Sequence, residues 1–156
     1  MSKTNVMRML ERQKAEFDIL TYTIDENDLS GEHAALELGL DPKMVYKTLV
    51  LHGDKTGYIV ACIPVCATLD LKALAKCSEN KNVEMIHVKD LFDITGYVRG
   101  GCSPIGMKKL FPTYIDQSIV SFDKIAFSAG QRGMQIKTAP ANLIKTVAAQ
   151  LCSIIL

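Results

Sequence analysis

Cysteine and histidine patterns that bind metal ions are missing from this sequence. Five cysteines and three histidines occur, but no two cysteines are spaced as CxxC and no histidines are paired at metal-ligand spacing. We therefore expect no structural zinc site and no other metal ion. The odd number of cysteines indicates reduced, mostly buried thiols in a reducing compartment, and hence a cytoplasmic protein. The five are Cys62, Cys66, Cys77, Cys102 and Cys152.

Motifs for cofactors, membranes and secretion are missing as well. No GxGxxG or Walker segment is present, so we expect no nucleotide cofactor. The longest apolar run, Tyr58 to Leu69, is interrupted by Pro64 and is too short to span a bilayer. Charges near the N-terminus are too closely spaced for a signal peptide. Cys152 is fifth from the end, whereas a prenylation motif has its cysteine fourth from the end, so we expect no prenylation. The apolar tail is expected to pack on the core or on a second subunit.

The chain also has little net charge, only +1. This balance excludes a broadly basic surface like that of a chromatin protein, but it leaves room for a local basic patch. The candidate cations for contacts with a nucleic acid are Arg8, Arg12, Lys14, Arg99, Lys108, Lys109 and Arg132.

The apolar pattern that is present predicts a single α+β domain over residues 1–156. Apolar residues make up 48% of the chain, enough for an ordinary core. Strands in the centre and helices at both ends favour α+β over a repeating βαβ chain. Helices are expected at residues 4–15, 31–38 (capped by Ser30 and ended by Gly39), from Pro42, and at 69–77, 88–92 and 140–151. Strands are expected at 17–22, 46–52, 58–65, 83–86, 113–115, 124–128 and 134–137.

The first candidate for chemistry is the segment from Pro42 to Leu51, where a short helix is expected to run into an apolar strand. Lys47 and Thr48 stand at this junction, so the lysine would point off the end of a core strand into a cleft. A solvated lysine at a strand end is the ordinary explanation. The functional explanation is a fixed cation that holds an ester oxygen, a ribose or a phosphate.

Two glycine-rich segments are the next candidates. Residues 96–106 contain four glycines and a proline, and glycine lets a backbone approach a ligand closely. The consecutive N–H groups from Gly100 to Ser103 could receive a carbonyl oxygen that becomes negative during a reaction. The turn at residues 128–133 could offer Ser128 and a backbone group to a substrate. An ordinary surface loop and a plain hairpin are the alternatives.

Cys102, inside the first of these segments, is a candidate nucleophile for a different class of enzyme. No histidine is clearly placed to activate it, because His87 lies fifteen residues upstream. A Gly-x-Ser-x-Gly elbow is missing too, so the sequence offers no convincing serine nucleophile.

Together these segments resemble the YbaK/EbsC family of aminoacyl-tRNA deacylases, which includes the editing domain inserted in bacterial prolyl-tRNA synthetases. The matching stretches keep the family's order and spacing; they are Val45–Leu49, Thr68–Lys72, Gly96–Gly106 and Ser128–Gly133. The resemblance implies a curved mixed sheet that closes into a partial barrel with flanking helices. It also implies a catalytic Lys47. The substrate-binding residues carried over are Tyr22, Thr48, Gly100, Gly101, Ser103, Ser128, Gly130 and Gln135.

One position departs from the family pattern. The family often has an acidic residue where this chain has Gln135. If that acid helps to hold the amine of the substrate, we expect this protein to bind its substrate more weakly or to prefer a different one.

The same resemblance implies a substrate and a route of cleavage. The expected substrate is a mischarged tRNA, first of all Cys-tRNA(Pro), whose ester breaks when the cysteine thiol attacks its own carbonyl. Holding the two groups together can lower such a barrier by roughly 7–11 kcal/mol. The expected partners are aminoacyl-tRNA and prolyl-tRNA synthetase, and the chain is expected to be a monomer or homodimer. The alternatives are an Ala-tRNA(Pro) deacylase that uses water, and a non-catalytic module that binds tRNA or protein.

Overall fold

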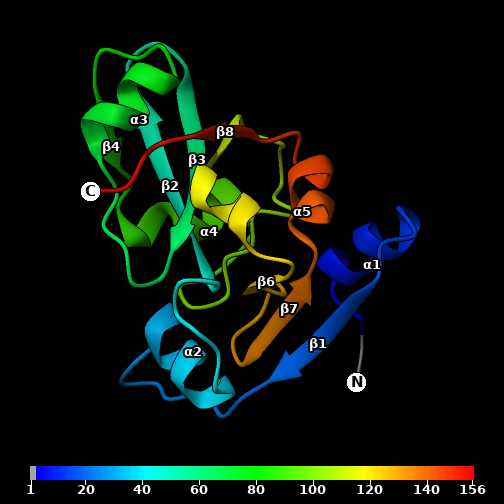
Figure 1. Cartoon of the computed structure of the whole chain (residues 1–156). Helices are drawn as coiled ribbons and strands as arrows, with labels where there is room; N and C mark the ends of the chain where they lie inside the picture. The colour runs from blue at the N-terminus through cyan, green and yellow to red at the C-terminus, as the bar shows by residue number, and fades with distance from the viewer. Residues whose placement is uncertain (1–2) are drawn as a thin grey trace.

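The computed structural model describes residues 3–156 as a mixed α+β fold (Figure 1). Its strands form two sheets. The smaller sheet, in the order β1-β7-β6, is antiparallel, and the larger, in the order β4-β2-β3-β5-β8, is parallel at β3-β5-β8 and antiparallel elsewhere. The strands are β1 (Phe17–Thr21), β2 (Tyr46–Gly53), β3 (Gly57–Pro64), β4 (Val83–Met85), β5 (Thr113–Asp116), β6 (Ile125–Ser128), β7 (Met134–Thr138) and β8 (Gln150–Cys152).

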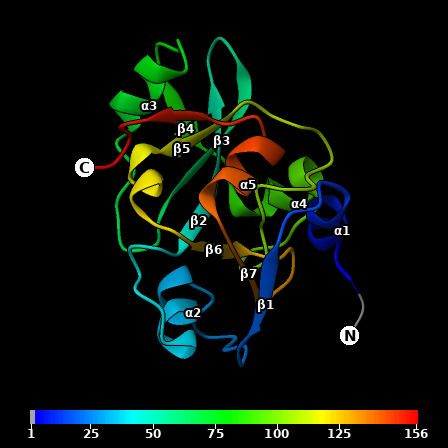
Figure 2. The ribbon, with the colours of Figure 1, turned by 45° about the vertical axis from the view of Figure 1, so that its right-hand side comes forward.

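Short helices surround the sheets, and in both views α2 lies at the end of the molecule opposite α3 (Figure 2). As predicted, Ser30 caps α2 by accepting from the His33 N–H, and Gly39 ends it in a left-handed conformation. Every helix within residues 3–156 is too short or too polar to traverse a bilayer. The helices are α1 (Asn5–Arg12), α2 (Gly31–Leu38), α3 (Leu71–Cys77), α4 (Leu91–Thr95) and α5 (Pro140–Thr146), with 3-10 turns η1 (Val88–Asp90) and η2 (Gln117–Ser121).

The two sheets meet where β6 runs beside the start of β2. Val45 and Ala126 form an isolated parallel bridge, and the Ala126 N–H donates to the Met44 carbonyl at 2.9 Å. The α+β class is therefore confirmed. The two sheets do not close into a barrel, and the expected partial closure is not confirmed.

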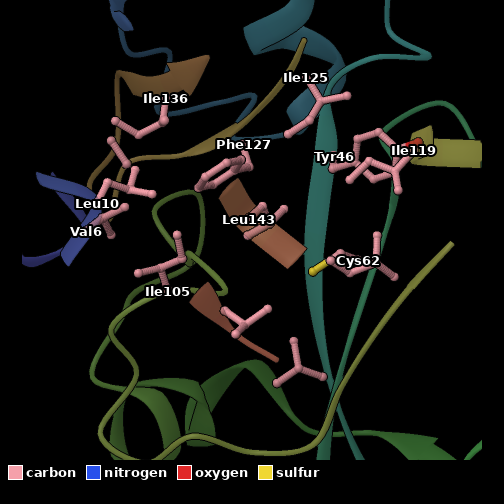
Figure 3. Close-up of a cluster of buried hydrophobic side chains, with 14 of the residues drawn as sticks. Val6, Leu10, Tyr46, Cys62, Ile105, Ile119, Ile125, Phe127, Ile136 and Leu143 are labelled. Atoms are coloured by element: carbon pink, nitrogen blue, oxygen red, sulfur yellow. The ribbon is translucent and has the colours of Figure 1, made fainter. Parts of the chain in front are cut away.

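The main core draws side chains from both sheets and from α1 and α5 (Figure 3). Val6 and Leu10, one helical turn apart on α1, are fully buried. Phe127 of β6 and Ile136 of β7 are also fully buried, and each such side chain contributes roughly 1.5–3 kcal/mol to folding. This core holds the smaller sheet against β2.

The C-terminal tail packs on the chain's own core, which was one of its two predicted positions. β8 pairs with β5, and Ile154 is fully buried in a second cluster with α3. The Ile154 N–H donates to Asp116 Oδ1 at 3.0 Å, and its carbonyl accepts from the Asp70 N–H at 2.8 Å. Hydrogen bonds therefore hold the tail in place together with its apolar contacts.

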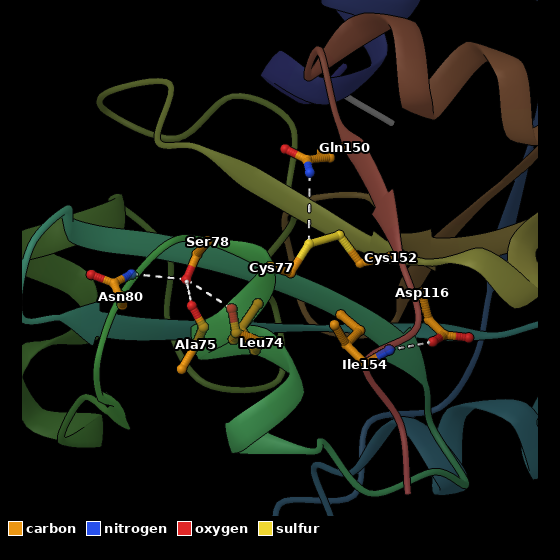
Figure 4. The surroundings of a disulfide bond; sticks show 9 residues. All are labelled: Leu74, Ala75, Cys77, Ser78, Asn80, Asp116, Gln150, Cys152 and Ile154. Carbon is orange, nitrogen blue, oxygen red and sulfur yellow. Dashed lines mark hydrogen bonds between the residues drawn. A yellow bond between two sulfur atoms is a disulfide. The ribbon is translucent and has the colours of Figure 1, made fainter.

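The prediction that all cysteines are reduced is wrong for one pair. Cys77, at the end of α3, and Cys152, in β8, form a disulfide across 75 residues of chain (Figure 4). The pairing of β8 with β5 brings the two residues together, and sequence spacing contains no sign of that. Cys62, Cys66 and Cys102 are free.

One further predicted helix is wrong, and another is predicted too long. Residues 42–44 form only a turn, in which the Asp41 side chain accepts from the Lys43 N–H at 2.9 Å, and β2 starts directly afterwards. The last helix ends at Thr146, because Ala148 takes a left-handed φ of 50° and turns the chain toward β8. The helical spacing of apolar residues extends beyond the end of the helix, because Val147 also packs into the core.

Candidate functional site

A small hollow lies where the start of β2, the end of β6, β7 and the start of α2 come together. Its volume is about 120 Å³, whereas pockets for drug-sized ligands span roughly 300–1,000 Å³. It therefore suits a small chemical group. The predicted site residues that line it are Tyr22, Lys47, Thr48, Gly100, Ser128 and Gln135.

Lys47 lines the hollow together with its neighbours on β2, Tyr46 and Thr48. The preceding Tyr46 is buried in the core, and its hydroxyl lies 2.7 Å from Ser118 Oγ. The start of α2 lines the same hollow. Gly31 allows the start of α2 to pack closely against Val65, since a Cβ there would lie 2.3 Å from Val65 Cγ1. Among the described residues, no carboxylate pairs with Lys47.

The glycine-rich loop forms another wall of the hollow and is held at both ends. The Tyr97 hydroxyl donates to the Ile105 carbonyl at 2.6 Å, which closes the loop. Gly100 lines the hollow with a φ of 85°, a conformation that glycine adopts readily. The Gly101 N–H donates to the Val98 carbonyl at 3.0 Å. The Gly101 N–H is therefore not free to donate to a ligand oxygen, contrary to the prediction for the N–H groups from Gly100 to Ser103.

Arg132 connects this loop to two other segments. Its Nε donates to the Arg99 carbonyl at 2.8 Å, and its Nη1 lies 3.4 Å from Glu26 Oε2. Gly101 packs against the same turn, since a Cβ there would lie 3.1 Å from backbone atoms of Gln131 and Arg132. Arg132 therefore positions the loop, in addition to being a candidate cation for tRNA.

Three predicted site residues do not line the hollow. Gly101 supports the loop from behind, as described above. Ser103 is fully buried, and its hydroxyl accepts from the Ile105 N–H at 3.3 Å. Gly130 has a φ of 98° and lies against the Tyr97 ring. These residues shape the site from within the fold.

Cys102 lines the hollow, but its surroundings do not activate the thiol. Burial raises the pKa of Cys102 to about 12, against the opposing effect of a hydrogen bond with Thr95. None of the histidines lies among the residues lining the hollow. Within residues 3–156, no three His, Cys, Asp or Glu side chains gather as metal ligands would. A reactive thiolate needs a lowered pKa, so the geometry disfavours Cys102 as a nucleophile.

Ser128 and Gln135 are cross-strand neighbours on β6 and β7, and both side chains line the hollow. Ser128 Oγ accepts from the Gly130 N–H at 3.2 Å. Gln135 is only 6% exposed. Its Oε1 is buried and has no hydrogen-bond partner among the described residues. An acceptor in this state is unusual in a folded protein.

Residues 26–146 match the family model described as the aminoacyl-tRNA editing domain. The matched range contains Lys47, the glycine-rich loop, Ser128 and Gln135, which is most of the hollow's wall. The chain belongs to this editing-domain family. The editing domain is also 49% identical over 152 residues to a protein of Enterococcus faecalis named "Putative Cys-tRNA(Pro)/Cys-tRNA(Cys) deacylase EbsC", covering 97% of this chain and 93% of that one.

Solved structures share the fold of this editing domain. It superposes on the hypothetical protein APE2540 with a TM-score of 0.88 and 18% identity, over 98% of this chain and 100% of that one. It superposes on "a putative trans-editing enzyme for prolyl tRNA synthetase" with a TM-score of 0.82 and 19% identity, over 99% of both chains. At this level of identity the likeness describes the fold alone.

The sequence did not point to one wall of the editing domain's hollow. Leu29, Ser30 and Gly31, at the start of α2, line it, although the sequence indicated only a helix cap there. The available signal was Gly31, because glycine directly after an N-cap weakens a helix. Its position is explained by the close approach of α2 to Val65.

Proposed function

We propose that this editing domain is a trans-editing deacylase that cleaves the ester of mischarged Cys-tRNA(Pro). The observation that carries the proposal is Lys47 in the wall of a hollow of about 120 Å³ that contains no paired nucleophile and base. Such a hollow suits a small aminoacyl group and leaves the attack to the substrate. The name of the E. faecalis relative supports the choice of cysteine.

In the proposed reaction the substrate attacks itself. The thiol sulfur of the cysteinyl group attacks its own carbonyl carbon, and the bond from that carbon to the tRNA 3′ oxygen breaks. The thiol proton ends on the departing oxygen, and water later opens the cyclic thioester to release cysteine. The protein contributes position, because thiol and carbonyl must be held in contact for their proximity to lower the barrier.

Lys47 serves this reaction by holding the oxygen side of the ester. Negative charge develops first on the carbonyl oxygen and then on the departing 3′ oxygen, and a fixed ammonium stabilises both. Thr48, next to it on β2, and Ser128, across the hollow, supply neutral hydrogen-bonding groups. The small volume would exclude larger aminoacyl groups sterically. A synthetase's own pocket cannot exclude an amino acid smaller than its intended one in this way, so a second, smaller pocket restores accuracy.

Aminoacyl-tRNA is the proposed substrate, and prolyl-tRNA synthetase is the proposed partner. Synthetase binding would supply the tRNA selectivity that a small hollow lacks. Arg99 and Lys108 are exposed near the glycine-rich loop and are placed to meet phosphates. Binding through such cations falls steeply with added salt.

The test is deacylation of Cys-tRNA(Pro) beside Ala-tRNA(Pro), with wild type, Lys47→Ala and the matched control Lys43→Ala. Lys43 is exposed and does not line the hollow. We expect Lys47→Ala to lose about 100- to 1,000-fold in kcat, as when one oxyanion donor is removed, with an unchanged circular dichroism spectrum. Lys43→Ala should match wild type.

Three outcomes separate the candidates. Deacylation of Cys-tRNA(Pro) but not of Ala-tRNA(Pro), with a rate that depends on Lys47, supports attack by the substrate thiol. Deacylation of Ala-tRNA(Pro) is consistent with a deacylase, but the attacking group would then be water and not a substrate thiol. Turnover of neither ester contradicts the proposal and favours a module that binds without catalysis. Full activity of Lys47→Ala contradicts the role proposed for Lys47.

A further inference from the structure

Three aromatic side chains form a row on the surface, and none of them lines the hollow. His52, at the end of β2, and Tyr58, at the start of β3, are cross-strand partners whose ring centroids lie 5.3 Å apart. The Tyr58 ring in turn lies 5.9 Å from that of Phe111. His52 is exposed, and Tyr58 is 39% exposed. The rings stand at 77° and 73° to one another, so they do not cover one another's faces as stacked rings would.

A cavity of about 140 Å³, which we call the α1 cavity, opens beside the last ring of this aromatic row. Phe111 forms part of its wall, together with Met9 of α1 and Met107. At this end of the molecule α1 packs beside α5 (Figure 2). A cavity of roughly 150 Å³ holds one benzene ring, and methionine sulfur makes favourable contacts with aromatic rings. The α1 cavity therefore has room for a single six-membered ring but not for two fused rings.

The wall of the α1 cavity also has polar groups that suit the edge of such a ring. Asn5 is exposed, and its amide makes only a weak hydrogen bond, from Nδ2 to Met9 Sδ at 3.8 Å. Thr113 Oγ1 donates to the Phe111 carbonyl at 2.9 Å and can still accept. A pyrimidine base presents both donors and acceptors on its edge, and an asparagine amide can bond to either kind.

The segment that passes the α1 cavity is positively charged. Residues 96–115 include three basic residues and no acidic one. Lys109 is exposed and lines the cavity. Glu84, the cross-strand neighbour of His52, puts negative charge at the opposite end of the aromatic row. A phosphate backbone would therefore lie at the Lys109 end.

We propose that the α1 cavity binds an unstacked pyrimidine of tRNA, and that the aromatic row stacks the neighbouring bases. Proteins recognise single-stranded RNA by stacking splayed bases on aromatic side chains and by bonding to base edges. The size of the cavity selects one ring, and hence a pyrimidine over a purine. The inference rests on the proposed function only in taking tRNA as the RNA, and it assigns a second site outside the hollow.

A partner protein is the other class of ligand that an exposed aromatic row can anchor. Protein interfaces, however, are enriched in arginine and depleted in lysine. The two exposed cations that precede Phe111, Lys108 and Lys109, are both lysines, and lysine binds phosphate groups well. The rings and the charge together therefore favour a nucleic acid.

The test measures binding of fluorescein-labelled hexacytidylate and hexaadenylate to the wild-type protein by fluorescence anisotropy. Neither probe carries an aminoacyl group. We expect hexacytidylate to bind at least about fivefold more tightly, the worth of one stacked base. Equal or tighter binding of hexaadenylate overturns the inference. So does an absence of hexacytidylate binding at roughly 100 µM protein, the weak limit of non-specific affinity, and a partner protein would then be favoured.

Two variants with matched controls locate the binding. Tyr58→Thr removes the central ring and keeps a residue favoured in strands, so it should weaken hexacytidylate binding at least about fivefold. Lys109→Ala should reduce the salt slope of binding by about one ion. Val120→Ala, at a 66% exposed apolar position, and Lys43→Ala should bind as wild type does. Unchanged affinity in Tyr58→Thr contradicts the inference, and His52→Ala repeats the test if that variant does not fold.

Competition with unlabelled tRNA identifies the source of the pyrimidine. A tRNA that displaces hexacytidylate only with its 3′ CCA intact supplies the base from its end, and one that also competes when trimmed supplies it from an internal loop. Failure of both to compete overturns the inference. Deacylation that fails while Tyr58-dependent binding of hexacytidylate holds contradicts only the proposed function. Deacylation without such binding contradicts only the second site.

Discussion

Cys102 shows how the surroundings of a single residue decide its chemistry. The thiol lines the hollow, in a loop that the sequence marks as a candidate active-site segment. Burial holds its pKa at about 12, so the thiolate that a nucleophile requires is scarce at neutral pH. Thr95, its hydrogen-bonding neighbour, only partly offsets the burial. The site must therefore obtain its attacking group elsewhere.

We expect Cys102→Ser to deacylate at close to the wild-type rate, because the thiol takes no part in the proposed reaction. Cys66→Ser, at an exposed free cysteine, is the matched control. Because the Cys102 pKa lies far above the assay range, the variant should also keep the wild-type pH profile between pH 6 and 9. A large loss of kcat in Cys102→Ser alone would instead identify a cysteine hydrolase.

The individual site residues were predictable to an uneven degree. Lys47 and Ser128 stood in stretches that match the family, Gln135 was named as a departure from its pattern, and all three line the hollow. The buried, unpaired state of Gln135 Oε1 was not predictable, because it depends on how β7 lies between β1 and β6. Ser103 stood in a motif as well, yet its burial reflects tertiary packing that a motif does not contain.

At the level of elements, the glycine-rich loop and the turn at 131–133 behave as one unit. Arg132 Nε donates to the Arg99 carbonyl, and Gly101 leaves no room for a side chain between the two backbones. The loop carries Gly100 and Cys102 into the lining. Any increase in the separation of loop and turn would therefore move that wall of the hollow.

We predict that Gly101→Ala lowers kcat/KM and costs about 1–3 kcal/mol of stability, as overpacking does. The added methyl group would lie 3.1 Å from backbone atoms, which cannot move aside as a side chain can. Gly39→Ala is the control, since its Cβ meets nothing within 4 Å. Its left-handed φ should cost roughly 1–2 kcal/mol without loss of activity. Urea denaturation and deacylation rates measure both effects, and equal activities would contradict the role given to the loop.

The elements themselves were predictable where local signals agree. Ser30 and Gly39 bound α2 as expected, and the β2–β3 hairpin is present as predicted. The C-terminal helix was too long, because its apolar spacing continued through a residue whose left-handed backbone depends on the pairing of β8. The division of the strands into two sheets was also beyond local patterns, since it depends on pairings between distant strands.

At the scale of the whole molecule, the C-terminal tail completes the second cluster of core residues. Ile154 is fully buried among side chains of β2, β3 and α3, and the Asp116 carboxylate binds its N–H. The adjacent disulfide joins the tail to α3. No residue of the tail is among those lining the hollow, but the larger sheet that carries Lys47 includes β8.

Ile154→Ala should lower the free energy of unfolding by about 2–5 kcal/mol, as other large-to-small changes in cores do. Leu156→Ala, at an 82% exposed position, should change it by no more than about 0.5 kcal/mol. Chemical denaturation of both variants gives the comparison. Equal stabilities would mean that the tail is peripheral to the fold.

The pairing of β1 with β7 has a consequence for how the protein is made. It joins Phe17 to Thr138, so Tyr22 and Gln135 can meet only after nearly the whole chain has been synthesised. The β2–β3 hairpin, by contrast, can form while the ribosome is still adding residues. Long-range pairing of this kind is slow, because a large loop must close before any contact is gained. A nascent chain would therefore carry Lys47 on a formed hairpin and yet be unable to select an aminoacyl group until translation is almost finished.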